Sequence, residues 1–241
     1  MTALDDSEIE RALIVTAHPD DVDFGAAGTI AGWVASGIDV AYCIVTYGDA
    51  GGFDPDVPRA DIPKVREAEQ RAAAAAVGVH DVTFLGYPDG RVEVSFDLRR
   101  DISRQIRRVR PQRLLTHSPM RNWQRIGPSH PDHLRTGEAA LCAVYPDARN
   151  PFAYPELLRD EGLADWKVAE VWLSGGPAPD HYVDVTETFD KKVAALREHA
   201  SQTAHMEDLE GMLRTWLSAG ALAASLPEGR LAESFQVIST A

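Results

Sequence analysis

The chain has 241 residues, of which 44% are hydrophobic and 25% are charged. This composition is typical of a globular protein with a sizeable core. Its 37 acidic and 24 basic residues give a formal net charge of −13, which argues against non-specific binding to nucleic acid or to an anionic membrane. No apolar run approaches the ~18 residues of a membrane-spanning helix, and the acidic N-terminus lacks the pattern of a signal peptide. We therefore expect a cytoplasmic protein without membrane insertion, folded as a single domain over residues 1–241.

The first predicted element is a buried strand that ends in a cluster of polar residues. Residues 12–16 are almost continuously apolar, as in the middle of a parallel sheet. The sequence then reads Ala17-His18-Pro19-Asp20-Asp21, which places one imidazole and two carboxylates at the end of the strand. A helix over 25–36 and a second strand over 39–46 complete a βαβ unit.

The same alternation continues along the chain. A long loop over 47–60 follows the second strand, and loops of this length are often functional. The sequence then predicts helices over 64–77, 97–109, 130–144, 156–160, 187–199 and 205–219, strands over 82–85, 113–117, 168–173 and 182–185, and a last edge strand over 235–238. This order predicts a three-layer, Rossmann-like α/β fold with a mostly parallel sheet flanked by helices. Ligands of such sheets bind beyond the carboxyl ends of the strands.

A run of arginines lies on the predicted helix over 97–109 and just beyond it, from Arg99 to Arg110. We interpret it mainly as a solvated face with cations near the helix C-terminus. Contact with an anion or with RNA is the alternative.

A second polar cluster, Ser129-His130-Pro131-Asp132-His133, follows the strand over 113–117. Ser129 is predicted to cap the next helix, with Asp132 in the acidic position of a capping box. His130 and His133 are three residues apart and would share one helical face. The segment repeats the chemistry of the first cluster at the same edge of the sheet. Because catalytic zinc is held by three protein ligands such as two histidines and one carboxylate, the two clusters together predict a metal site.

Together the two His-Pro-Asp clusters resemble those of the PIG-L/LmbE-like family of metal-dependent N-acetylglucosamine-conjugate deacetylases. Weaker matches lie along most of the chain: Gly28-Thr29, the loop over 46–52, Arg66-x-x-Glu69, Gly86-x-Pro88-Asp89-Gly90, Val183-Asp184-Val185-Thr186 and Lys192…His199-x-Ser201-Gln202. Val22 departs from the pattern, since many members carry Glu after the double Asp. We expect this difference to affect packing or a supporting hydrogen bond rather than the ligands.

The resemblance implies a role for each residue of the first cluster and for its partner on the second. His18, Asp21 and His133 would be the metal ligands. Asp20 would be the general base that takes a proton from water.

The resemblance also implies a general acid and two substrate contacts. His130, held by Asp132, would protonate the leaving amine or stabilise the oxyanion, and pairing with Asp132 would raise its pKa. Arg66 and Asp89 would bind substrate, although Arg66 is also readable as an exposed helix arginine and Asp89 as a turn residue. His117 would line the pocket, and His199 would support the site or serve as a cation at a helix C-terminus.

The sequence therefore predicts a zinc-dependent hydrolase that removes the N-acetyl group from an N-acetylglucosamine-type sugar or its conjugate. Fe²⁺ or another divalent transition metal is an alternative to zinc. The partner is a small molecule rather than nucleic acid, and a homo-oligomer is possible.

Three alternatives remain open. The first is an amidase that cleaves a larger amide, such as a thiol (mycothiol-like) conjugate. A non-catalytic nucleotide- or metal-binding module is the second, although the G-x-G-x-x-G fingerprint is absent. The third is a magnesium-binding phospho-acceptor switch, which would leave His130 and His133 unused.

Overall fold

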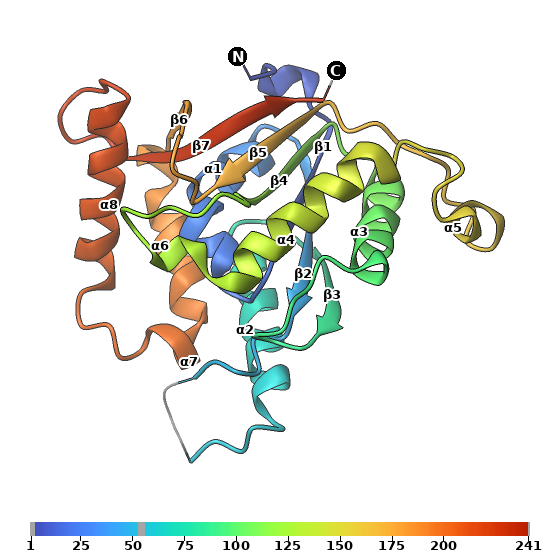
Figure 1. Ribbon diagram of the computed structural model, residues 1–241. Coiled ribbons are helices and arrows are strands. Elements are labelled where there is room, and N and C mark those ends of the chain that lie inside the picture. The colour runs from blue at the N-terminus through green and yellow to red at the C-terminus, as the bar shows by residue number, and fades with distance from the viewer. Residues whose placement is uncertain (1–2, 53–55, 241) are drawn as a thin grey trace.

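The computed structural model describes residues 3–52 and 56–240. One seven-stranded sheet crosses the protein in the order β3-β2-β1-β4-β5-β7-β6 (Figure 1). The strands are β1 (Arg11–Thr16), β2 (Asp39–Thr46), β3 (Asp81–Tyr87), β4 (Arg113–His117), β5 (Glu170–Ser174), β6 (His181–Asp184) and β7 (Ala232–Ser239). Strands β1 to β5 pair in parallel, and β7 runs antiparallel to both β5 and β6. The expected α/β fold with a mostly parallel sheet is confirmed.

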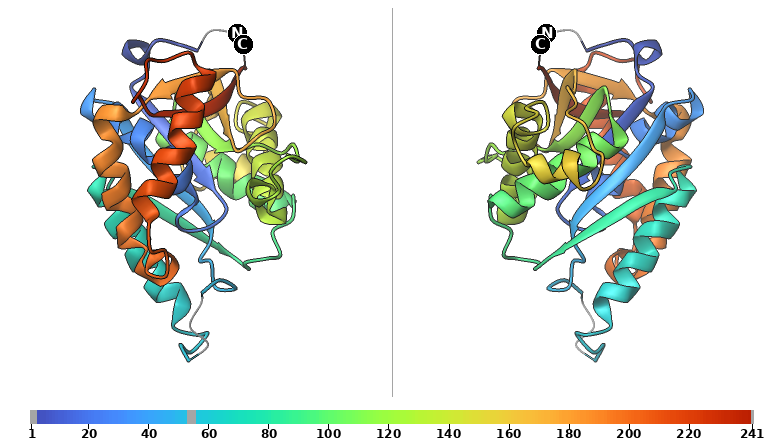
Figure 2. Two further views of the ribbon diagram at one scale, coloured as in Figure 1. Left: turned by 90° about the vertical axis from the view of Figure 1, so that its left-hand side faces the viewer. Right: turned by 90° about the vertical axis from the view of Figure 1, so that its right-hand side faces the viewer.

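Helices cover both faces of this sheet, as Figure 2 shows. They are α1 (Asp21–Ala35), α2 (Ile62–Ala76), α3 (Phe96–Val109), α4 (Pro131–Cys142), α5 (Pro155–Arg159), α6 (Phe189–Glu198), α7 (Ala200–Thr203) and α8 (Leu209–Ala223). One core lies between the sheet and α1, α2 and α6, and a second lies between the sheet and α3 and α4. On α3, Leu98, Ile102 and Ile106 recur every fourth residue and are fully buried, which is the apolar stripe of an amphipathic helix.

Several predicted elements differ from the structure in position. Helix α8 spans Leu209–Ala223 rather than the predicted residues 205–219. The last strand is not an edge strand, because β7 pairs with β5 on one side and β6 on the other. Helix α1 begins at Asp21, four residues before the predicted start at residue 25. Asp21 and Asp23 lie in the first turn, where acidic residues are favourable at the positive end of the helix dipole. The last residue of the polar cluster, Asp21, is therefore part of the helix, and Asp20 is its N-cap. Residues 53–55 of the predicted 47–60 loop lie outside the described residues.

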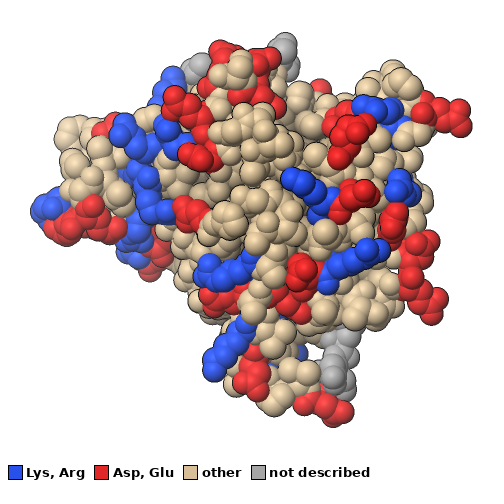
Figure 3. All heavy atoms as spheres, turned by 180° about the vertical axis from the view of Figure 1, so that it is seen from behind, with Lys and Arg blue, Asp and Glu red and all other residues tan. Residues whose placement is uncertain are grey.

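Four of the five arginines of α3 are paired with acidic side chains, as the solvated-face interpretation expects. The exception is Arg107, which is 2% exposed and donates to backbone carbonyls such as that of Asn150 at 2.9 Å. Arg99 binds Asp147, Arg100 binds Asp97 and Asp101, Arg104 binds Asp101 and Glu161, and Arg108 binds Asp81. Figure 3 shows the two signs of charge interspersed on the face seen from behind. Among the described residues, none of the helices has both the length and the apolarity needed to span a bilayer.

A buried ion pair holds the beginning of α1 in place. Lys192 of α6 is 0% exposed and Glu233 of β7 is 3% exposed, and Lys192 Nζ lies 2.7 Å from Glu233 Oε1. Lys192 also donates to the carbonyls of Asp23 and Phe24, at 2.8 and 2.7 Å. Glu233 accepts from the backbone of α1 at Gly28 and Thr29. The pair therefore links α6 and β7 to α1, the helix that begins at the last residue of the first polar cluster.

We predict that Lys192→Met lowers the free energy of unfolding by about 3–5 kcal/mol, because it leaves the Glu233 carboxylate buried without its cation. The melting temperature should fall by at least about 6 °C. Lys191→Met is the matched control, since Lys191 is the exposed neighbour on the same helix. Equal melting temperatures for the two variants would contradict this account of the pair.

Candidate metal centre

The two polar clusters meet because their strands are neighbours in the sheet. β1 pairs in parallel with β4, so both strands end at the same edge. His18 and Asp21 follow β1, and His133 lies in the first turn of α4, after β4. The adjacency that the sequence implied is therefore present in the structure.

The three predicted ligands place their donor atoms close together, with each carboxylate oxygen of Asp21 facing one histidine. His18 Nδ1 lies 3.3 Å from Asp21 Oδ2 and 3.3 Å from His133 Nε2. His133 Nε2 lies 2.9 Å from Asp21 Oδ1. Ligand atoms around a tetrahedral zinc ion with bonds of about 2.0–2.1 Å are about 3.3 Å apart. The spacing of this triad fits a divalent transition metal.

The other nitrogen of each ligand histidine faces an oxygen atom. His133 Nδ1 donates to the carbonyl of Pro128 at 3.1 Å. His18 Nε2 lies 3.1 Å from Asp89 Oδ1 and 3.2 Å from Asp132 Oδ2. Such contacts fix the tautomer of a ligating histidine and orient its ligating nitrogen, here Nδ1 of His18 and Nε2 of His133, toward the metal. The donor set is therefore oriented as well as assembled.

The charges in the cluster also favour a bound cation. Burial opposes a charge on His18, but the carboxylates of Asp21, Asp132 and Asp89 outweigh it and raise the pKa of His18 to about 12. Burial also opposes the charge on Asp21, yet the adjacent histidines hold its pKa well below the usual range. Three carboxylates thus surround one imidazole, and a metal ion would balance this excess of negative charge.

His117 belongs to the same cluster. Its ring stacks on that of His133 with centroids 4.1 Å apart, and its Nε2 lies 3.2 Å from Asp21 Oδ2. Burial, together with the charge of His133, lowers the pKa of His117 to about 4. Among the described residues, three other groups of donors overlap the predicted triad: His18 with His130 and His133, Asp21 with His117 and His133, and His18 with Asp89 and Asp132.

Asp20 stands next to the triad in an unusual backbone conformation. It is the N-cap of α1, with φ 80° and ψ −24°, and left-handed conformations at non-glycine residues often occur at functional sites. Arg66 Nη2 lies 2.9 Å from Asp20 Oδ2. Burial raises the pKa of Asp20 to about 6, against the attraction of Arg66. Its carboxylate is not one of the three that surround His18.

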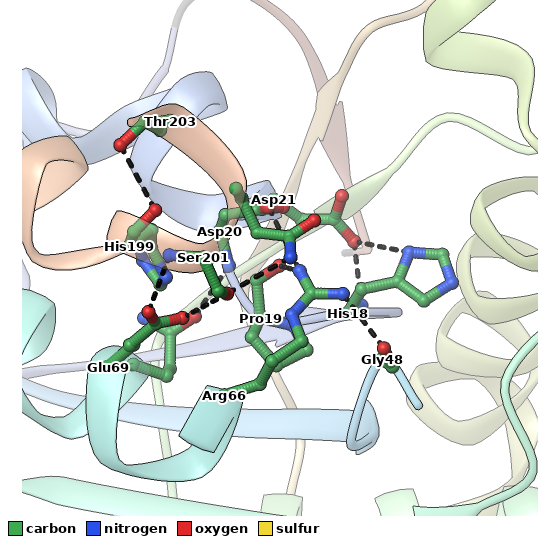
Figure 4. Close-up of polar contacts among 12 residues, drawn as sticks. His18, Pro19, Asp20, Asp21, Gly48, Arg66, Glu69, His199, Ser201 and Thr203 are labelled. Carbon is green, nitrogen blue, oxygen red and sulfur yellow. Dashed lines mark hydrogen bonds and ion pairs between the residues drawn. The ribbon is translucent and has the colours of Figure 1, made fainter. Parts of the chain in front are cut away.

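Arg66 is buried rather than exposed, at 4% of its accessible surface. It reaches from α2 and donates to the carbonyls of Gly48 and Pro19, at 3.0 and 2.7 Å, as well as to Asp20 (Figure 4). The exposed-helix interpretation of Arg66 is therefore wrong. Its contacts fix the carboxylate of Asp20 and the loop before it, and its role as a substrate contact stays a prediction.

The cap of α4 differs from the predicted one. Ser129 Oγ accepts from the backbone of Asn122 at 2.8 Å and does not cap the helix. His130 is the N-cap, and its Nδ1 accepts from the backbone N–H of Asp132 at 3.2 Å. A neutral imidazole that accepts at Nδ1 carries its proton on Nε2. The Nε2–H of His130 is therefore a hydrogen-bond donor.

The carboxylate of Asp132 does not hold His130, contrary to the prediction. It accepts from the backbone of Gly90 at 2.7 Å and of Val92 at 3.2 Å, and its remaining contact is with His18. Burial and the neighbouring charge of His18 lower the pKa of His130 rather than raise it. Asp132 therefore orients His18, a predicted metal ligand, and ties it to the loop after β3.

Asp89 lies in that loop as well, and its side chain is only 8% exposed. One carboxylate oxygen faces His18, and the other accepts from the backbone of Ala50 at 2.9 Å. The structure thus brings Asp89 into the site, beyond a role in the turn alone.

Comparison with known proteins shows which family the chain belongs to. Residues 13–144, more than half of the chain, match the family described as PIG-L: GlcNAc-PI de-N-acetylase. The chain belongs to this family. It is an enzyme of the deacetylase class. PIG-L deacetylases are metal-dependent, and the His/Asp cluster fits a metal site.

Three similar proteins cover most of this PIG-L chain. A probable N-acetyl-alpha-D-glucosaminyl L-malate deacetylase 2 from Bacillus cereus is 32% identical, over 85% of this chain and 89% of its own length. A 1D-myo-inositol 2-acetamido-2-deoxy-alpha-D-glucopyranoside deacetylase from Actinosynnema mirum is 30% identical, over 90% and 89%. The structure of N,N'-diacetylchitobiose deacetylase from Pyrococcus horikoshii superposes with a TM-score of 0.87 at 27% identity, over 97% of this chain and 85% of the other.

Proposed function

We propose that the protein is a zinc-dependent N-deacetylase that hydrolyses the acetamide group of an N-acetylglucosamine-containing conjugate. The observation that carries this proposal is the triad His18, Asp21 and His133 beside a further carboxylate, Asp20. One imidazole pair and one carboxylate suit zinc, with ferrous iron as the next candidate. When bound, such a metal polarises an acyl carbonyl and makes water more acidic.

The surrounding residues supply the proton transfers of amide hydrolysis. Water adds to the acetyl carbon, and Asp20 accepts a proton from it. The C–N bond then breaks as the proton held by Asp20 passes to the leaving amine nitrogen, and the Nε2–H of neutral His130 donates a hydrogen bond to the oxyanion. The His130 ring lies 5.0 Å from that of His18 and 5.4 Å from that of His133, between centroids, and is exposed to solvent. We assign Arg66 and Asp89 as contacts to the sugar.

The substrate class rests on what the relatives share. Their names place the same 2-acetamido sugar on malate, on myo-inositol and on a second amino sugar. We therefore propose a 2-acetamido sugar as the substrate class and do not specify the group attached to it. An amidase for a larger amide, such as a thiol conjugate, remains the second candidate because the same machinery would cleave it. A cytoplasmic location and a homo-oligomer remain predictions.

Acetate release from a panel of conjugates tests the proposal. We expect at least one of the malate, inositol and chitobiose conjugates to release acetate about tenfold or more faster than with an Asp20→Asn control. Matched glucosides without the acetamide should release none. Cleavage of a larger acyl conjugate without acetate release would favour the amidase instead, and no hydrolysis of either kind would contradict the proposed function.

A further inference from the structure

We propose that Gln70, Asp23 and His199 form a buried support that positions the general base Asp20. None of these three residues touches the substrate or the metal ligands in our assignment, so they are positioning residues. The inference rests on the proposed function, because it matters only if Asp20 is the base.

The support begins at the backbone of Asp20. The Asp20 N–H donates to Gln70 Oε1 at 2.8 Å. Asp20 has a left-handed backbone, which an L-residue adopts at a cost in free energy and keeps only where its surroundings enforce it. Arg66 fixes the carboxylate of Asp20, and Gln70 fixes its main chain. The two contacts come from one face of α2, since residues 66 and 70 are four apart.

The amide of Gln70 is oriented by its second contact. Its Nε2 donates to Asp23 Oδ2 at 2.8 Å. With a donor bond on one end and an acceptor bond on the other, the amide has only one orientation that satisfies both partners. Gln70 and Asp23 are both 0% exposed, so water does not compete for these bonds.

His199 completes the support from the corner between α6 and α7. Its Nε2 lies 2.8 Å from the same oxygen of Asp23, and it is 0% exposed. A carboxylate buried this deeply needs a hydrogen-bonded partner, preferably a cationic one. By binding the oxygen that accepts from Gln70, His199 keeps the carboxylate in place as the acceptor for Gln70.

The corner itself is anchored to neighbouring elements. Thr203 Oγ1 donates to the His199 carbonyl at 3.0 Å, and Ser201 binds Glu69 of α2 through both its N–H and its hydroxyl, at 2.7 and 2.6 Å. Figure 4 shows His199, Ser201 and Glu69 on the side of Asp20 away from the His18 ring. The support thus contacts Asp20 on the side that faces away from the metal centre.

The decisive experiment is a double-mutant cycle between Gln70→Met and Asp20→Asn. Methionine keeps the length and volume of Gln70 but removes both of its hydrogen bonds. We expect Gln70→Met to lower kcat by about 10–100-fold, with KM and metal content close to those of the unchanged protein. Its melting temperature should fall by at least about 2 °C, because the Asp20 N–H and the buried Asp23 carboxylate each lose a hydrogen-bond partner. In the Asp20→Asn background the same change should cost less than about twofold, since the base it positions is already absent.

Two further variants separate this role from general packing. Ser201→Ala removes a hydrogen bond of the same corner that does not lead to Asp20, and it should leave kcat nearly unchanged. His199→Gln, which retains an N–H donor for Asp23, should keep most of kcat, whereas His199→Leu should match Gln70→Met. If Gln70→Met does not fold, the His199 variants and the Ser201→Ala control still test whether the support positions Asp20.

Three other results would contradict the proposal, and each has a different cause. Additive losses in the double-mutant cycle would show that Gln70 acts independently of Asp20. Loss of metal from Gln70→Met would place its effect on the ligands. If Asp20→Asn alone retained full activity, the proposed function of Asp20 would fail, and the cycle would reveal this separately.

Discussion

His133→Ala should abolish both metal binding and deacetylation. His133 contributes the only ligand of the proposed triad that comes from α4, and its Nε2 lies within 3.3 Å of the donor atoms of His18 and Asp21. Without it, two donors remain from the segment after β1, which is too few for a catalytic zinc site. We expect metal content to fall from about one ion per chain to below about one tenth, and the rate of acetate release to fall by about a thousandfold or more.

Metal analysis and a thermal shift measure this effect independently of the substrate. Added zinc should raise the melting temperature of the unchanged protein by mass action and should not raise that of His133→Ala. His130→Ala is the matched comparison, because His130 lies on the same turn and belongs to an alternative donor group. We expect it to retain metal and lose rate. Metal retained by His133→Ala and lost from His130→Ala would reverse the two assignments.

The position of the metal centre was predictable from the sequence because it depends on topology. Two clusters that each follow a buried strand must lie at one edge if those strands are parallel neighbours. β1 and β4 satisfy this condition, so His18, Asp21 and His133 meet although they come from segments more than a hundred residues apart. The residue types alone then limit the chemistry to metal binding and proton transfer.

The partners of Asp132 were not predictable in the same way. Within its own segment, Asp132 has the spacing of a capping box, and the nearest base is His130. Its carboxylate instead accepts from the N–H groups of Gly90 and Val92. Those donors lie about forty residues earlier in the chain, in a loop whose path depends on how β3 ends. A local pattern does not encode a contact of this kind.

The interior position of β7 was hidden by its polar residues. Residues 232–239 read Ala-Glu-Ser-Phe-Gln-Val-Ile-Ser, and Glu233 suggests an exposed or terminal position, because glutamate is seldom buried without a partner. Here the partner is Lys192, which sequence proximity does not reveal. Similarly, the role of Gln70 follows only from the placement of α2 beside the N-terminus of α1. Its one sequence signal is the four-residue spacing from Arg66.

Asp20→Asn should separate metal binding from catalysis. Asparagine has nearly the same shape, and its carbonyl oxygen can still accept from Arg66, which lies 2.9 Å from Asp20 Oδ2. The backbone bond to Gln70 is unaffected. What is lost is the ability to accept a proton from the attacking water, so kcat should fall by about 10²–10⁴-fold. KM and the content of about one metal ion per chain should be unchanged, because the triad is intact.

The comparison variant is Asp49→Asn, at a carboxylate in the loop after β2 that accepts a long contact of 3.4 Å from the backbone of Asp89. It should leave kcat nearly unchanged. Loss of metal from Asp20→Asn would instead make Asp20 a ligand, and a rate close to that of the unchanged protein would require a different base. His117 would then be the first group to test, because it lies against Asp21 and holds its imidazole neutral through burial. Asp20 and Asp21 therefore have different roles only if Asp20→Asn loses activity while it retains the metal.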